Sequence, residues 1–226
     1  MKTSDFDFYL PEELIAQTPT LNRSESKLLV LDRVTGEITH ERFYNIINYL
    51  DSNDILVLNN TKVIPARIYG NKESTNAKIE LLILKNISGD IYECLVKPAR
   101  RIHVGDVVSF QDGLLRCRCI ETFSEGIVHF EFIYEGVLLE ILDKIGSMPL
   151  PPYIHEKLDD KDRYQTVYAR DYGSSAAPTA GLHFTEELLN ALKEKGVTIC
   201  YVTLHIGLGT FRPVKWSPAV GAALLP

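Results

Sequence analysis

Long apolar runs, abundant cysteine and metal-ligand motifs are all missing from this sequence of 226 residues. No run approaches the roughly 18 apolar residues of a membrane-spanning helix, and the acidic start around Asp5 does not resemble a secretory signal. Four cysteines are present, and their spacing suggests no metal site. Only Cys117 and Cys119 are close, and strand alternation would place both on one face as core or edge filler. We therefore expect no metal, no membrane span and a reducing, cytoplasmic location.

Charge is unevenly distributed along the chain. The formal net charge is −6, which argues against indiscriminate nucleic-acid binding. The segment 62–119 nevertheless carries 10 basic and 6 acidic residues, a net charge of +4. Such a segment is typical of a localised phosphate-facing surface. A solvated, lysine-rich face is the plainer interpretation, and composition does not decide between them.

Six short segments between 63 and 133 have the pattern of strands. Turn sequences that contain Gly89, Gly105 and Gly113 separate them. Six strands at this spacing predict a small closed or nearly closed antiparallel barrel. The expected strands are 63–69, 77–84, 91–96, 106–110, 114–122 and 127–133.

The regions on either side mix helix and strand patterns. A hairpin is expected from 27–31 and 37–41, followed by a helix at 43–50 and a buried strand at 54–58. Further along, the pattern predicts helices at 137–145 and 186–195 and a strand at 197–204. The predicted fold class is an α/β main domain formed from both chain ends, with an inserted small antiparallel β-barrel domain. The main domain would comprise 1–61 and 150–226, and the barrel 62–149.

The stretch from Gly173 to Thr185 is the most distinctive part of the chain. Nine small or turn-forming residues precede His183, and Thr185 is suited to cap a helix that starts at Glu186. Small residues let a backbone approach a ligand closely, and a helix start favours an anion such as a carboxylate. The alternative is a tight structural loop with a capping histidine.

This loop and five other segments resemble the S-adenosylmethionine:tRNA ribosyltransferase-isomerase family of the bacterial queuosine pathway. The segments occur in the family's order and cover nearly the whole chain. They are DFDFYLPEELIA at 5–16, LNNTKVIPAR at 58–67, PLPPYI at 149–154, RYQTVYA at 163–169, GSSAAPTAGLHFT at 173–185 and TLHIGLGTFRPV at 203–214. The family's chains continue further with motifs rich in histidine, glutamate and arginine. The last residues here, 216–226, do not resemble that continuation, so a truncated or altered end is expected.

The resemblance implies S-adenosylmethionine as a co-substrate that donates its ribosyl group, with no prosthetic group and no metal. The acceptor would be the aminomethyl-deazaguanine wobble base of tRNA. Transfer and isomerisation would give epoxyqueuosine and release adenine and methionine. This chemistry needs a base for the proton beside the sulfonium, an acid for adenine, a neutral acceptor amine and exclusion of water. The sequence Gly207-Leu208-Gly209 is too short for a dinucleotide fingerprint, which fits a donor site outside the usual methyltransferase fold.

Proton transfer points to His183 and His205, which lie beside small residues at element ends and titrate near working pH. Either could be the base, and a structural role is the alternative for each. We expect the donor to contact the loop through Gly173, Thr179, Gly181 and Thr185. Replacement of Gly181 by valine is expected to weaken donor binding strongly and to leave the fold intact.

Other polar residues complete the predicted site. Asn59, Asn60 and Thr61 can bond a nucleoside's hydroxyls or ring edge, while Lys62 and Arg67 could meet phosphate; a polar hinge between domains is the alternative. Arg163 and Arg212 could pair with the methionine carboxylate. Tyrosines could stack on a flipped base, although core packing is the safer interpretation for most of them. They are Tyr153, Tyr164, Tyr168 and Tyr172.

A compact basic cluster on the expected barrel contains Lys97, Arg100 and Arg101, with His103 nearby. Together with Lys62 it is the predicted tRNA-binding set, because barrel faces often hold single-stranded nucleic acid. The favoured function is thus a monomeric tRNA-modifying transferase. The alternatives are a noncatalytic RNA-binding barrel on an α/β support and an inactive, truncated fragment of the enzyme.

Overall fold

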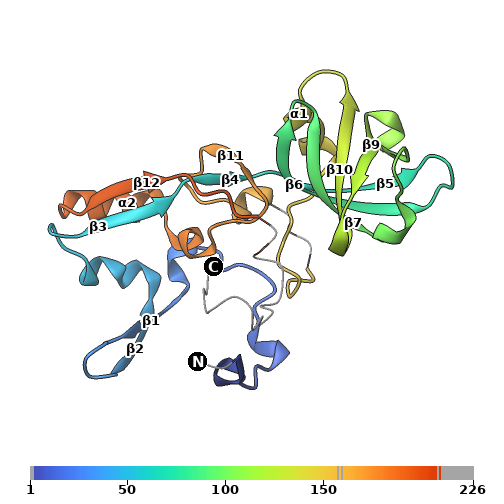
Figure 1. The fold of residues 1–226 in the computed structure, drawn as a ribbon. Helices are drawn as coiled ribbons and strands as arrows, with labels where there is room; N and C mark the ends of the chain where they lie inside the picture. Colours follow the sequence, from blue (N-terminus) through green and yellow to red (C-terminus); the bar gives the residue numbers. More distant parts are fainter. Residues whose placement is uncertain (1–2, 157, 159, 208, 210–226) are drawn as a thin grey trace, which may run out of the picture.

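The computed structural model describes residues 3–156, 158, 160–207 and 209. Two parts lie side by side in Figure 1: a barrel from the middle of the chain, and a flatter α/β part built from segments on both sides of it. The predicted fold class, an α/β domain with an inserted small antiparallel barrel, is confirmed.

The barrel is closed by six antiparallel strands in the order β10-β7-β6-β5-β8-β9. Glycine-containing turns join several of them, and Gly105, Gly113 and Gly126 have positive φ angles that other residues adopt at a cost. The strands are β5 (Arg67–Lys72), β6 (Lys78–Ser88), β7 (Ile91–Lys97), β8 (Val107–Phe110), β9 (Leu115–Thr122) and β10 (Ile127–Tyr134).

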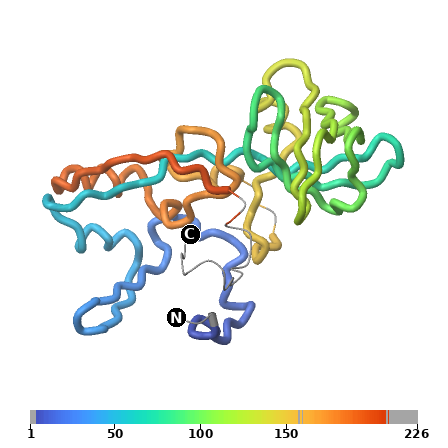
Figure 2. The backbone as a smooth tube through the Cα atoms, in the orientation of Figure 1, coloured from blue at the N-terminus to red at the C-terminus, as the bar shows by residue number. Residues whose placement is uncertain are grey.

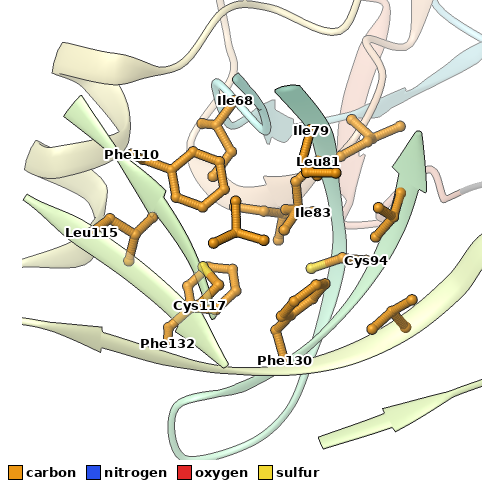
Figure 3. Close-up of a cluster of buried hydrophobic side chains, with 14 of the residues drawn as sticks. Ile68, Ile79, Leu81, Ile83, Cys94, Phe110, Leu115, Cys117, Phe130 and Phe132 are labelled. Atoms are coloured by element: carbon orange, nitrogen blue, oxygen red, sulfur yellow. The ribbon is translucent and has the colours of Figure 1, made fainter. Parts of the chain in front are cut away.

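Alternate side chains of these strands fill the barrel, as Figure 3 shows. Phe110, Phe130 and Leu115 are fully buried among aliphatic residues from the other strands. Cys117 and Cys119 lie on one buried face of β9, as the sequence predicts. Burial raises the pKa of the Cys117 thiol well above its usual range, which suits a core residue and not a reactive one.

The first expected barrel strand, 63–69, is wrong in its position. Residues Thr61–Val63 form β4, which pairs in parallel with β11 (Asp171–Ser174) in the α/β part. Pro65 follows, and its ring leaves no N–H for a continued ladder. The barrel therefore begins at Arg67, and the expected domain boundary at 61/62 falls inside β4.

The α/β part contains the parallel pair β3 (Ile55–Asn59) and β12 (Thr198–Val202). Helix α2 (Glu186–Glu194) packs Leu188 and Leu192 against one face of this pair. Thr185 caps the helix, since its hydroxyl oxygen accepts a 3.2 Å hydrogen bond from the N–H of Leu188. The predicted cap and helix are thus confirmed.

The opposite face of β3 departs from the prediction of a buried strand. Ile55 is 65% exposed and Val57 is 57% exposed, while Leu58 on the other face is buried. Parallel strands are normally covered on both faces. Here only the α2 side is covered within the described residues.

The remaining elements complete the α/β part and the return from the barrel. Strands β1 (Lys27–Leu31) and β2 (Ile38–Arg42) form the predicted hairpin, and α1 (Leu138–Ile145) follows the barrel. The expected helix at 43–50 is a 3₁₀ helix, Phe43–Tyr49. The other 3₁₀ helices are Thr3–Phe6, Glu12–Leu14, Arg23–Glu25, Ala99–Arg101, Gln111–Gly113, Ser124–Gly126, Lys161–Tyr164 and Thr179–His183.

The N-terminal segment lies beside the segment that follows the barrel, the blue and gold stretches of the tube in Figure 2. The Gln17 amide donates to the carbonyl of Tyr153 at 3.0 Å and accepts from the N–H of His155 at 2.8 Å. No helix in the described part of the chain is both long and apolar enough to cross a membrane.

The junction between the two parts depends on buried polar side chains. The Gln165 side-chain amide accepts a 3.0 Å hydrogen bond from the N–H of Val63 and donates a 2.7 Å hydrogen bond to its carbonyl. It thus satisfies both backbone groups of Val63, as a neighbouring strand would. Ser175 donates its hydroxyl to the carbonyl of Ile83 in β6 at 3.2 Å, and its N–H to the carbonyl of Ile206 at 2.9 Å. Close approach of these segments requires the small, buried residues that begin the 173–185 loop.

Candidate active site

The carboxyl ends of the parallel strands carry most of the polar residues that the sequence singles out. Asn59 ends β3, Asn60 and Thr61 follow it, and His205 comes three residues after β12 ends beside them. Ligands of open α/β sheets bind at this edge of the strands. We name the group Asn59, Asn60, Thr61, Asp171, Gly173, Thr203 and His205 the strand-edge cluster.

Two asparagines hold the backbone of this cluster. The Asn59 amide donates to the carbonyl of Leu204 at 2.8 Å and accepts from the N–H of Leu204 at 3.0 Å. The Thr203 hydroxyl donates to Asn60 Oδ1 at 2.7 Å. The segment that leads to His205 is therefore fixed to the end of β3 before any ligand binds.

His205 has a defined partner and a defined neighbour. Its Nδ1 lies 2.7 Å from Thr61 Oγ1. A Cβ at Gly173 would lie 2.9 Å from the ring, and Gly173 has a φ of +146°, so both space and backbone conformation require glycine there. For His205 to act as a base through Nε2, Nδ1 must carry the proton and donate it to Thr61.

Asp171 belongs to the cluster although the sequence analysis did not single it out. Its carboxylate Oδ2 lies 3.1 Å from the Thr203 hydroxyl oxygen, and the Arg170 guanidinium lowers its pKa, which keeps it charged. Its position in the sequence, two residues before the small-residue loop, was the available signal. In the sheet Asp171 pairs with Thr61.

His183 lies in a separate setting from His205. Its Nδ1 is 2.8 Å from Ser26 Oγ, and its ring packs on Phe43 with centroids 5.1 Å apart. Burial lowers the pKa of His183, so the neutral ring is favoured. The structure thus brings Gly173 and His205 together with the polar strand exit, whereas His183 packs beside the N-terminal segment.

Gly181 does not leave open space for a ligand. A Cβ at this position would lie 2.2 Å from Tyr168 Oη and 2.9 Å from Thr166 Cγ2. The expectation that Gly181→Val would leave the fold intact is therefore wrong, because the chain's own tyrosine occupies the space. Thr179 is exposed on the same short helix.

We expect Gly181→Ala to lower the free energy of unfolding by about 1–3 kcal/mol, the usual cost of overpacking. The loss should be smaller in a Tyr168→Phe background, since that change removes the closest atom. Urea denaturation of both single variants and the double variant measures this coupling. Equal losses in the two backgrounds would contradict it, and exposed Ala180→Ser serves as the control.

The start of α2 has little room for an added carboxylate. Thr185 takes the N–H of Leu188, and Glu186 and Glu187 place two negative charges in the first turn. The backbone N–H of Glu187 lowers the pKa of its own carboxyl, so that amide is also engaged. A donor carboxylate would therefore have to compete with Thr185 and Glu187 for the N–H groups at this helix start, and the two glutamates would repel it. The sequence alone did not indicate this competition.

The predicted cations have different settings. Lys62 Nζ lies 4.6 Å above the Tyr172 ring, on the opposite side of β4 from Thr61 by strand alternation. Arg67 pairs with Glu80 at 3.4 Å at the base of the barrel. The Arg163 guanidinium donates a hydrogen bond to the carbonyl of Thr20. Arg212 lies outside the described residues.

Among the tyrosines, Tyr164 is buried in a small core cluster with Val63 and Ala177, as the packing interpretation predicts. Tyr168 is half-buried, and desolvation raises its pKa to about 12. Tyr153 and Tyr172 are exposed. Only these last two have rings available to a partner at the surface.

The predicted basic cluster is at the surface of the barrel. Lys97 ends β7, and Arg100 and Arg101 lie in the 3₁₀ helix that follows; all three are exposed. The described residues contain no group of three or more His, Cys, Asp or Glu side chains placed to hold a metal ion.

Sequence comparison decides the family. The profile of the family described as queuosine biosynthesis protein matches residues 3–220. This chain belongs to that family. The match spans the hairpin, the barrel and the strand-edge cluster, so each of these features is part of a queuosine biosynthesis protein.

A solved structure provides the second comparison. The crystal structure of an S-adenosylmethionine tRNA ribosyltransferase from Thermotoga maritima shares 35% sequence identity with this family member. The match covers 90% of this chain and 58% of that chain, with a TM-score of 0.37. This family member thus spans 58% of that relative's length.

Proposed function

We propose that this chain is a tRNA-modifying transferase that uses S-adenosylmethionine as co-substrate. It transfers and isomerises the ribosyl group onto the aminomethyl-deazaguanine wobble base of tRNA, giving epoxyqueuosine and releasing adenine and methionine. Membership of the queuosine biosynthesis family and the 35% identity to a ribosyltransferase support this reaction.

The observation that carries the proposal is the position of His205 in the strand-edge cluster. Thr61 Oγ1 lies 2.7 Å from Nδ1, so Nε2, which lies beside Gly173, is the nitrogen left to face a bound donor in this proposal. In this proposal His205 takes the proton beside the sulfonium, whose positive charge acidifies that carbon. Asn59, Asn60 and Thr61 bind the nucleoside, with Gly173 and Thr179 lining its approach.

Other residues have supporting roles in the proposal. Gly181 and Thr185 keep the shape of the loop, and Arg67 and Arg212 pair with anionic groups of the substrates. Lys62, with Lys97, Arg100 and Arg101, contacts tRNA phosphates. We also propose a cytoplasmic monomer with two domains, an α/β main domain from both chain ends and a barrel domain whose first strand begins at Arg67.

Incubation with S-adenosylmethionine and tRNA that carries the aminomethyl-deazaguanine base is expected to release adenine and methionine in equal amounts. Chromatography of the small molecules and mass spectrometry of the digested tRNA measure both products. Release without the modified base would indicate simple donor hydrolysis. Without release of either product, the proposal fails for this chain.

A second candidate function is a noncatalytic RNA-binding barrel, which the exposed cluster of Lys97, Arg100 and Arg101 favours. It predicts tRNA binding that is independent of S-adenosylmethionine and no product release. An inactive fragment that binds neither substrate would be separated from it by a direct tRNA titration.

A further inference from the structure

An open groove lies on the outer wall of the barrel, outside the strand-edge cluster. It crosses β5, β6 and β8 and has a volume of about 850 Å³, within the range of about 300–1,000 Å³ for small-ligand sites. Its lining includes Tyr69, Asn71, Lys78, Glu80, Lys97 and Gln111. We name this feature the barrel groove.

Strand register places these side chains together. Tyr69 lies opposite Glu80, and Glu80 lies opposite Lys97, so the three form one row across β5, β6 and β7. Their neighbours Ile68 and Leu81 point into the core in Figure 3. Alternation therefore turns the row outward. The Tyr69 side chain is 61% exposed.

More positive than negative charges in the groove lack an ion-pair partner among the described residues. Glu80 pairs with Arg67, and Glu73 makes two hydrogen bonds with Arg116. Among the described residues Lys78 and Lys97 have no ion-pair partner, and Asp112 at the groove's edge is the remaining carboxylate. The groove therefore presents two free ammonium groups beside an exposed ring.

This combination matches the chemistry of an unpaired nucleotide. An exposed ring offers a stacking surface to any base, and ammonium groups pair with the adjoining phosphates. The amides of Asn71 and Gln111, which also line the groove, can bond a base edge. The row ends at Lys97, from which Arg100 and Arg101 continue the basic surface.

We propose that the barrel groove binds an unpaired nucleotide of an RNA strand, with the base stacked on Tyr69 and its phosphates near Lys78 and Lys97. The proposal depends on the proposed function only for the source of the strand, which would be the tRNA substrate. Stacking in itself is independent of the chemistry at His205.

Titration of a labelled single-stranded oligouridine pentamer and of tRNA tests the groove. Tyr69→Ala is expected to weaken binding of both by about 10-fold, within the range reported for one base–aromatic stack. Tyr69→Phe should retain most of the affinity, because the ring remains. Tyr49→Ala, an exposed tyrosine outside the barrel, is the matched control and should bind like the wild type.

Lys78→Ala should reduce the slope of log affinity against log salt by about 0.7, as for one single-strand phosphate. Wild-type affinity in Tyr69→Ala, or no oligouridine binding by the wild type, would overturn the groove proposal. Tyr69-dependent binding of an acidic peptide in place of RNA would also overturn it. If the wild type releases adenine but Tyr69→Ala binds RNA as tightly as the wild type, the groove proposal alone is rejected. If RNA binding depends on Tyr69 but no adenine is released, the proposed reaction alone is rejected.

Discussion

Replacement of His205 by alanine is expected to reduce turnover by about 10²–10⁴-fold, the range for loss of a general acid or base. The affinity for S-adenosylmethionine should change much less, because Asn59 and Asn60 still shape the strand exit. Single-turnover adenine release and calorimetric donor titration measure the two quantities separately. His40→Ala, on the exposed hairpin, is the control for loss of an imidazole.

Substitutions at Thr61 provide a second test of His205 as the base. Thr61→Val removes the hydroxyl that holds Nδ1, so turnover should fall, whereas Thr61→Ser should keep most of it. Near-normal single-turnover rates in both His205→Ala and Thr61→Val would reject His205 as the base and move the proton transfer elsewhere.

His183 can be distinguished by its pH dependence. Burial lowers the pKa of this side chain, so a reaction that uses it as base should retain activity below the ordinary histidine pKa of about 6.5. Below that pH the unfolded chain binds the proton more readily than the folded chain, so the folded state loses stability as the pH falls. His183→Asn should remove this part of the pH dependence of unfolding.

Simultaneous replacement of Lys97, Arg100 and Arg101 by alanine is expected to flatten the plot of log tRNA affinity against log salt by about two units. The estimate follows from three phosphate contacts at about 0.7 each for a single strand. Donor binding should stay unchanged, because the cluster lies on the barrel and not in the strand-edge cluster. Filter binding across a salt series measures the slope.

A matched control removes three exposed cations from the α/β part, Lys27, Arg33 and Lys193. This control variant lowers the net charge by the same amount. A flatter slope of log tRNA affinity against log salt in both triple variants would therefore indicate a general charge effect. An unchanged slope in the barrel variant would support the solvated-face interpretation.

The barrel could be predicted from the sequence because local signals specify it. Buried and more exposed residues alternate along β9 and most of β10, and glycines with positive φ mark several of the turns. The helix at 186 was predictable for the same reason, since Thr185 and the leucines behind it belong to one short segment. The position of β5 was missed by a few residues because the parallel pairing of β4 with β11 joins segments far apart in the chain.

The site was less predictable because its geometry depends on distant partners. Small residues in the 173–185 loop indicated that another group approaches the backbone closely, but not which group. The structure shows that Tyr168 approaches Gly181 and that the His205 ring approaches Gly173. Likewise no local pattern could show that Thr61 holds His205, or that Asp171 joins them. Residue types suggested the chemistry, and only the three-dimensional contacts separated His205 from His183.

Ser175 has a mechanical consequence for a protein that would work on a large substrate. Its hydroxyl is bonded to the barrel wall at Ile83, and its N–H is bonded to Ile206, the residue next to His205. Ser175 therefore bridges the barrel wall and the backbone beside His205 through two hydrogen bonds. For the proposed function, these hydrogen bonds set the distance that an RNA loop bound to the barrel must span to reach His205.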